Sequence, residues 1–406
     1  MKKSYLLTNI LDYIILFTLI FTSRETLLFG TNQDAIMVMV GYICPVIVLL
    51  ILLLRKHKDG SKSSTNLLVT LCACTIVTMF FNFDINIKYG YEILLYLLSY
   101  LIANQIKFDK FVNIFCDIIL FLAFFAVFSA VVYYVTPSLL SLFPVVENKS
   151  NIQFYNMFLS VIPSERYGVF FRSYGIFREP GVAMIFFNIA LIFELFFKGK
   201  KYFMRLMLLI LAVGLTFSTA GYIVLLGIIA VYILNKNNKK SFGYSFVVVM
   251  AFIGGVFLIS YNDYINMMVF GKFSNSQSSS TSARFGSVYN NISLIIEKPI
   301  GILWGLGYQY VEDAFELLGK RSYGGEGHNT NTILKELSVH GAFYASCIVT
   351  ELYLFIKRRL LLSEMTTFLL FVVIVAAFGN EDLTVNILLF LLVFYSQRNI
   401  KYVRKA

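Results

Sequence analysis

The chain has 406 residues, of which 58% are hydrophobic and only 14% are charged, and its mean hydropathy is +0.74. Soluble domains carry about 25% charged residues, so this composition excludes a soluble globular protein. The formal net charge of +11 would suit nucleic-acid binding, but the basic residues lie in short loops between apolar segments and form no basic, aromatic surface outside them. We therefore predict no nucleic-acid partner.

Apolar segments recur along the whole chain. A membrane-spanning helix needs about 20 apolar residues, and fewer where it is buried in a bundle. By this measure the predicted spans are residues 6–22, 35–54, 67–83, 91–106, 111–135, 182–197, 203–217, 219–234, 244–260, 339–355, 366–378 and 383–395. The sequence thus predicts an all-α, polytopic membrane protein with about twelve transmembrane helices. Residues 1–406 are predicted to form a single integral membrane domain.

Loop charges orient these spans, because cytoplasmic loops carry an excess of Lys and Arg. If Lys2 and Lys3 are cytoplasmic, every second loop should be basic. Those loops and the C-terminal tail hold Arg55, Lys56, Lys58, Lys62, Lys107, Lys110, Lys198, Lys200, Lys201, Lys236, Lys239, Lys240, Lys357, Arg358, Arg359, Arg398, Lys401, Arg404 and Lys405. The short loops of the opposite side hold Glu25, Asp34, Asp84, Glu381 and Asp382. Both termini are therefore predicted to be cytoplasmic.

Two predicted outer loops are long, at residues 136–181 and 261–338, whereas the cytoplasmic loops are short. The short loops leave no room for a nucleotide-binding domain, and the chain has no Walker-type Gly-Lys-Ser/Thr loop. All five cysteines fall inside apolar segments and are interpreted as small apolar residues rather than disulfides or metal ligands. Any chemistry is therefore predicted on the outer side, with no cofactor.

The first candidate motif runs from Arg172 to Gly181, Arg-Ser-Tyr-Gly-Ile-Phe-Arg-Glu-Pro-Gly, just before the sixth span. It places Arg172, Arg178 and Glu179 among glycines at the membrane surface. Arginine binds phosphate in a bidentate manner, and glycine lets backbone approach a ligand closely. The alternative is an interfacial turn whose arginines contact lipid headgroups, and the residues alone leave both interpretations open.

Further short motifs follow in chain order. The Ser218 region, Phe-Ser-Thr-Ala-Gly, is predicted to form a tight hairpin between two short spans, and its small residues favour packing rather than chemistry. Arg284 opens a stretch to residue 296 that is typical of an amphipathic surface helix. The run Gly-Gly-Glu-Gly-His-Asn at 324–329 contains Glu326 and His328.

His328 is the one histidine of three that follows a glycine-rich turn on the predicted outer side. A histidine there suits a general base or a hydrogen-bonding group, and the alternative is an ordinary surface-loop histidine. No second His or Cys lies at ligand spacing from it, so no metal site is predicted. Two carboxylates, Asp12 and Asp117, fall inside spans, which keeps a proton-coupled transporter as an alternative. Glu194 and Glu351 are expected to reach water near the cytoplasmic ends of their spans.

The ordered set of these motifs resembles the bacterial O-antigen polymerase and O-antigen ligase superfamily (Wzy and WaaL). The resemblance covers about Arg172 to Gly341: the Arg-x-x-Gly-x-Phe-x-x-Pro pattern, the Ser-rich hairpin, Arg284, the turn at 305–307 and the His328-Asn329 pair. One feature departs from the family, because Thr330-Asn331 fits the expected distance to Gly341 better than His328-Asn329 does.

The resemblance implies a glycosyltransferase that takes a glycan from undecaprenyl diphosphate and needs no metal. Arg172, Arg178 and Arg284 would bind the diphosphate, and His328, or else Glu179 or Glu326, would orient or deprotonate the acceptor hydroxyl. The favoured function is a polymerase of O-antigen or capsular polysaccharide in lipopolysaccharide or capsule biosynthesis. Alternatives are an O-antigen ligase and, from another class, a lipid-linked oligosaccharide flippase or transporter.

The same resemblance implies a location and partners. The protein would be a multi-pass protein of the bacterial inner (plasma) membrane with its active site on the periplasmic, outer face. Its partners would be the undecaprenyl-diphosphate-linked oligosaccharide, membrane lipids, a chain-length regulator and a flippase.

Overall fold

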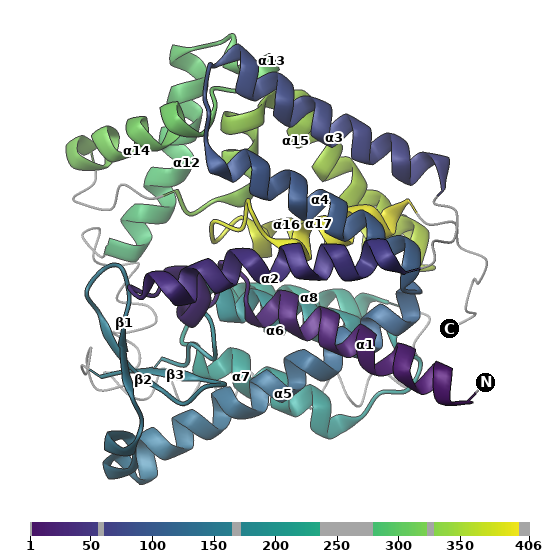
Figure 1. Ribbon diagram of the computed structural model, residues 1–406, viewed down its shortest axis with the longest axis vertical. Helices are drawn as coiled ribbons and strands as arrows, with labels where there is room; N and C mark the ends of the chain where they lie inside the picture. The colour runs from purple at the N-terminus through teal and green to yellow at the C-terminus, as the bar shows by residue number, and fades with distance from the viewer. Residues whose placement is uncertain (1, 56–60, 165–171, 236–278, 323–328, 398–406) are drawn as a thin grey trace. The chain divides into compact units, whose positions relative to one another are not determined.

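The computed structural model describes residues 2–55, 61–164, 172–235, 279–322 and 329–397 (Figure 1). The chain divides into two compact units. The first comprises Met1–Ser64, Leu94–Leu225 and Val385–Arg398, and the second comprises Thr65–Ile93, Leu226–Thr384 and Asn399–Ala406.

Every predicted span within the described residues coincides with a helix, while the predicted span 244–260 lies outside them. Among the described helices, five are long and apolar enough to cross a membrane: Ala35–Leu54, Lys62–Phe81, Phe108–Val135, Pro180–Phe197 and Thr332–Arg359. The architecture is therefore that of an all-α membrane protein, with few strands. The number of spans and their orientation stay predictions.

The first unit is built around α6, which is buried on every side. Its principal elements are α1 (Lys2–Phe21), η1 (Leu27–Thr31), α2 (Ala35–Leu54), α5 (Phe108–Val135), α6 (Pro180–Ile192), η3 (Phe193–Phe197), α7 (Phe203–Leu215) and α17 (Ile387–Ser396). All 13 residues of α6 are buried, and α5, α6 and α7 pack against one another. Pro180 starts α6, where a missing backbone N–H costs no helical hydrogen bond. Three further helices, α3 (Lys62–Phe81), α4 (Ile87–Gln105) and α8 (Thr219–Leu234), contribute residues to both units.

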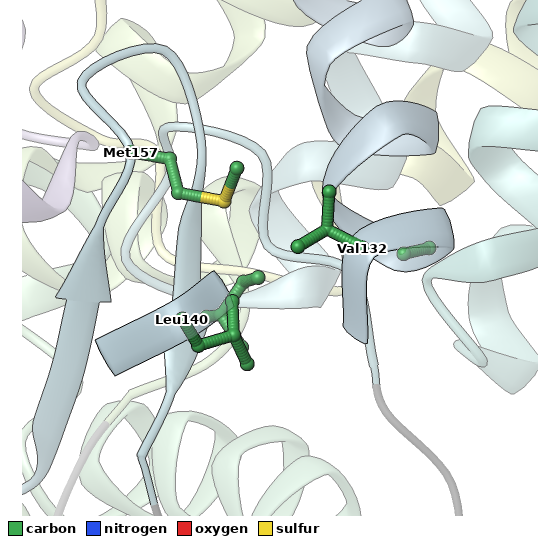
Figure 2. Close-up of a cluster of buried hydrophobic side chains, with 5 residues drawn as sticks. Val132, Leu140 and Met157 are labelled. Carbon is green, nitrogen blue, oxygen red and sulfur yellow. The ribbon is translucent and has the colours of Figure 1, made fainter. Parts of the chain in front are cut away.

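A small sheet in the first predicted outer loop departs from the all-α expectation. After the short helix η2 (Pro137–Leu142), the strands β1 (Val145–Glu147), β2 (Gln153–Asn156) and β3 (Val161–Pro163) pair antiparallel in the order β1-β2-β3. Strands of three or four residues are too short to show a period-two pattern in the sequence. A buried cluster joins this sheet and η2 to the end of α5 (Figure 2); its members are Ala130, Val132, Leu140, Met157 and Ile162.

The second predicted outer loop belongs to the second unit, and the described part of that loop is largely helical. Its elements are α12 (Ser279–Glu297), α13 (Gly301–Trp304), α14 (Tyr308–Ser322), α15 (Thr332–Arg359) and α16 (Glu364–Phe378). Because α15 is interrupted at Gly341, where φ is 87°, the carbonyls before the break lose their helical partners. Two backbone N–H groups following α13 replace them: Leu306 donates to Ser338 O at 2.8 Å and Gly307 donates to Val339 O at 3.1 Å.

Candidate functional site

The first arginine motif is attached to the turn between α7 and α8. The backbone N–H of Ser173 donates to Leu215 O at 2.8 Å, and Arg172 Nε donates to Thr216 O at 3.3 Å. The Arg172 side chain is half-buried and also interacts electrostatically with the hydroxyl of Tyr222 on α8. The Arg172 motif and the Ser218 turn, which two predicted spans separate in the sequence, therefore form one local structure.

The α7–α8 turn is itself a tight helix reversal. Phe217 has a φ of 46°, and buried Ser218 caps α8 by accepting a hydrogen bond from the Gly221 N–H at 3.3 Å. A Cβ on Gly221 would lie 3.0 Å from Met184 Cβ of α6. These contacts agree with the prediction that the small residues of this turn serve packing, and they place Ser218 in a capping role.

Arg178 is surrounded by carboxylates. Its Nε donates to Glu25 Oε2 at 3.0 Å and its Nη1 donates to Glu179 Oε1 at 2.8 Å, while its backbone N–H donates to Glu25 O at 2.8 Å. Glu25 is buried and the Glu179 side chain is 49% exposed. Arg178 thus ties the end of the first predicted outer loop to the short loop after α1, which is a structural task.

The segment that follows the predicted catalytic histidine is fastened to α12. The side-chain amides of Asn329 and Asn291 exchange hydrogen bonds, at 3.1 and 3.3 Å. The Thr330 N–H donates to Ser287 Oγ at 2.8 Å, and Asn331 caps α15 by accepting from the Leu334 N–H at 2.9 Å. Because Asn291 and Ser287 are one helical turn apart on α12, a single face of that helix holds this segment.

Three of the predicted site residues have limited or no description. His328 and Glu326 lie outside the described residues. Arg284 belongs to α12, although its side chain is not described. The segment that is hydrogen-bonded to α12 nevertheless begins at Asn329, directly after His328. Helix α12 also contains Arg284. Arg284 and Arg172 belong to different units.

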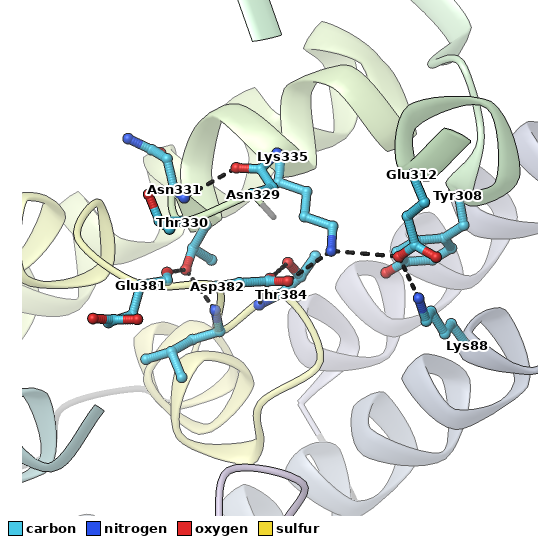
Figure 3. Close-up of polar contacts among 12 residues, drawn as sticks. Lys88, Tyr308, Glu312, Asn329, Thr330, Asn331, Lys335, Glu381, Asp382 and Thr384 are labelled. Carbon is cyan, nitrogen blue, oxygen red and sulfur yellow. Dashed lines mark hydrogen bonds and ion pairs between the residues drawn. The ribbon is translucent and has the colours of Figure 1, made fainter. Parts of the chain in front are cut away.

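A second polar network surrounds the start of α15 (Figure 3). Lys335 Nζ lies 2.7 Å from Asp382 Oδ2 and 3.7 Å from Glu312 Oε1, and Lys88 also pairs with Glu312. The Thr332 hydroxyl donates to Glu381 O at 2.5 Å. The predicted short outer loop before α17 therefore holds the first turn of α15 through the Asp382 carboxylate and the backbone carbonyl of Glu381.

A buried acidic and histidine cluster was not predicted from the sequence. Glu92 of α4 meets Glu336 and His340 of α15, and all three side chains are at most 1% exposed. The one available signal is the spacing of Glu336 and His340, which puts both on one helical face. Nothing in the sequence links them to Glu92, because that contact spans 248 residues.

The carboxylates predicted inside spans have cationic partners. Asp12 is bound by Arg55, with Nη1 at 2.6 Å, and by Lys110. Asp117 lies 2.6 Å from Arg205 Nη2. These contacts favour a structural role for both carboxylates over a proton path.

Glu194 corrects an expectation. It was expected to reach water, but its side chain is only 1% exposed, because α6 and the first three residues of η3 are buried. Lys198 Nζ at 3.0 Å and Arg205 Nη2 at 2.7 Å compensate its charge inside the protein.

Comparison with known proteins gives no family assignment: no protein-family model, curated protein or solved structure matches the chain.

Proposed function

We propose that the chain is a glycan polymerase that moves a glycan from undecaprenyl diphosphate to a sugar hydroxyl of a second lipid-linked repeat unit. The reaction takes place at the outer face of a bacterial inner membrane. The observation that carries this proposal is the attachment of Asn329 and Thr330 to Asn291 and Ser287 of α12. It brings the segment adjoining His328 to the helix that contains Arg284.

Position on α12 supports the role of Arg284. Arg284 precedes Ser287 by three positions and Asn291 by seven, the spacing at which helical residues share a face. A guanidinium and an imidazole that act on the same substrate would suit a donor that leaves as a diphosphate. The arginine stabilises the charge that develops on the leaving group. The histidine accepts the proton of the attacking hydroxyl.

The proposed reaction is balanced without a cofactor. The bond between the sugar C1 and the diphosphate oxygen breaks, and a glycosidic bond to the acceptor oxygen forms. The acceptor proton passes to His328, with Glu179 and Glu326 as the alternative bases, and undecaprenyl diphosphate departs. Cleavage of the sugar–diphosphate bond supplies the driving force.

Contacts of the acidic short loops support the proposed orientation. Glu25 pairs with Arg178 of the first long loop, and Asp382 pairs with Lys335 of the second. Asp84 accepts a hydrogen bond from the backbone N–H of Gln309 at 3.0 Å. Each contact joins segments that loop charge assigns to the outer side.

The alternatives differ in what they require. An O-antigen ligase would use the same donor with a different acceptor, so the fold does not separate it from a polymerase. A proton-coupled flippase would need titrating carboxylates inside spans, and the cationic partners of Asp12 and Asp117 weigh against it.

A deletion strain separates these functions. We expect deletion of the gene to remove long surface glycans while a single repeat unit stays attached, as resolved on a glycan gel. Loss of all attached glycan with accumulation of lipid-linked polymer would instead indicate a ligase. An unchanged ladder would contradict both enzymes.

Complementation of that strain tests the arginines. We expect Arg172→Ala and Arg284→Ala to restore no long glycans although the protein inserts, and Arg284→Lys to restore little because lysine lacks the bidentate fork. Lys149→Ala is the control, since it removes an exposed charge from the first long loop. Full ladders from both alanine variants would contradict a diphosphate-binding role.

A further inference from the structure

Glu92, Glu336 and His340 form a buried polar cluster in the second unit. His340 Nε2 lies 3.2 Å from each oxygen of Glu92 and 3.8 Å from Glu336 Oε2. Their potential ligand atoms all lie within 4.8 Å of one another. Glu336 and His340 point the same way because they are one helical turn apart on α15.

Much of the hydrogen-bonding capacity of this cluster is unused among the described residues. Neither carboxylate oxygen of Glu336 has a hydrogen-bond partner, nor do Glu92 Oε2 and His340 Nδ1. Lys335, the residue next to Glu336, is directed to Asp382 instead. Buried carboxylates are normally paired with cations, bound to metals or protonated, so two adjacent ones favour a positive charge between them.

The spacing of the ligand atoms fits one metal ion. Zn²⁺ bonds to histidine nitrogen and carboxylate oxygen at about 2.0–2.2 Å, which separates ligand atoms of a tetrahedral site by roughly 3.4 Å. The distances of 3.2 and 3.8 Å from His340 Nε2 bracket this value. A mixed imidazole and carboxylate set suits transition metals rather than Mg²⁺ or Ca²⁺.

We propose that Glu92, Glu336 and His340 bind one divalent transition-metal ion, for which Zn²⁺ is the best-matched probe. Its charge of two balances the two carboxylates. The Tyr308 hydroxyl donates to Glu92 Oε1 at 2.5 Å and so orients that ligand from outside the coordination shell.

The surroundings indicate a structural ion. The rings of Tyr89, Tyr308 and Tyr344 all pack on the imidazole, with centroids 5.9, 5.6 and 4.4 Å from that of His340. The ion would join α4 to the part of α15 before the Gly341 break. This role is independent of the proposed glycan transfer, whose metal-free chemistry uses other residues.

Metal content and thermal stability of the full chain in detergent test the proposal. We expect the protein purified without chelator to contain about one equivalent of transition metal by mass spectrometry. Removal of the metal by EDTA dialysis should lower Tm by at least about 3 °C, and ZnCl₂ alone should restore it. Less than roughly 0.1 equivalents, together with no Tm response to ZnCl₂, would overturn the proposal.

Variants separate this site from adventitious binding. Glu336→Gln and His340→Gln should lose the metal and the Tm response, whereas Glu312→Gln, which changes a carboxylate of α14 paired with Lys88, should keep both. Equal metal in the wild-type and Glu336→Gln proteins would show an adventitious ion only. If the ligand variants do not fold, the change in Tm of the wild-type protein on EDTA dialysis and ZnCl₂ addition still tests the proposal.

Discussion

Two arginines of one motif differ in what surrounds them. Arg172 is half-buried and contacts a backbone carbonyl of the α7–α8 turn. Arg178 lies between Glu25 and Glu179 and carries two ion pairs. Both arginines have the same role, phosphate binding, in the sequence-based prediction. The contacts give Arg178 a structural role as well, because the buried Glu25 would lose a cationic partner without it.

This difference predicts separable effects on stability. Arg178→Ala should lower the free energy of unfolding by about 3 kcal/mol, because removing one partner of a buried ion pair strands the other charge. Arg172→Ala should lower it less. Unfolding in detergent by SDS titration measures both variants.

Glu25→Gln provides the matched control for Arg178. If the stranded charge is the cause, the double variant Arg178→Ala/Glu25→Gln should recover part of the stability that Arg178→Ala loses. Additive losses from the two substitutions would contradict an energetic coupling between these side chains.

At the scale of elements, the crossing of α13 and α15 depends on two glycines. Gly305 has a φ of 78°, and a Cβ there would lie 2.0 Å from Val339 O. A Cβ on Gly341 would lie 2.5 Å from Leu303 O. The close approach lets the N–H groups after α13 reach the carbonyls exposed by the break in α15. Both positions therefore require glycine because backbone atoms lie close to them, and not because a substrate binds there.

Gly305→Ala should destabilise the protein by at least about 2 kcal/mol, since the new methyl group meets backbone that cannot move aside. Gly90→Ala on α4 is the control: nothing lies within 4 Å of a Cβ there, and alanine in a helix should add about 0.5–1 kcal/mol. SDS titration compares the two. Equal stability of the two variants would contradict a close backbone contact between Gly305 and α15.

At the scale of the whole molecule, polar contacts follow the predicted sides of the membrane. Arg55 and Lys110, from loops predicted to be cytoplasmic, both bind Asp12. Glu25 and Arg178, from loops predicted to be outer, bind each other. These contacts are compatible with the predicted grouping of the loops, and the orientation stays a prediction.

Cysteine labelling tests this orientation. In a background without the five native cysteines, a membrane-impermeant maleimide should label Ser150→Cys in intact spheroplasts, because exposed Ser150 lies in the first long outer loop. Lys62→Cys, exposed at the start of α3, should be labelled only after permeabilisation. The reverse pattern would contradict the predicted topology.

The sequence by itself determined the membrane class and the positions of the helices within the described residues. These depend on local properties, namely the length and apolar content of each segment. The bounds of α2 and α8 agree with the predicted spans to the residue. The short sheet was missed because its strands are too brief to carry a pattern.

Only the tertiary structure decided which polar groups meet. Arg178 and Glu25 are 153 residues apart, and His340 and Glu92 are 248 residues apart. No local pattern encodes such pairs, because they follow from how helices pack and where they break. Asn331 caps the start of α15, and the contacts beside it place the segment after His328 on α12. Sequence motifs thus named candidate residues, while packing determined which polar side chains are partners.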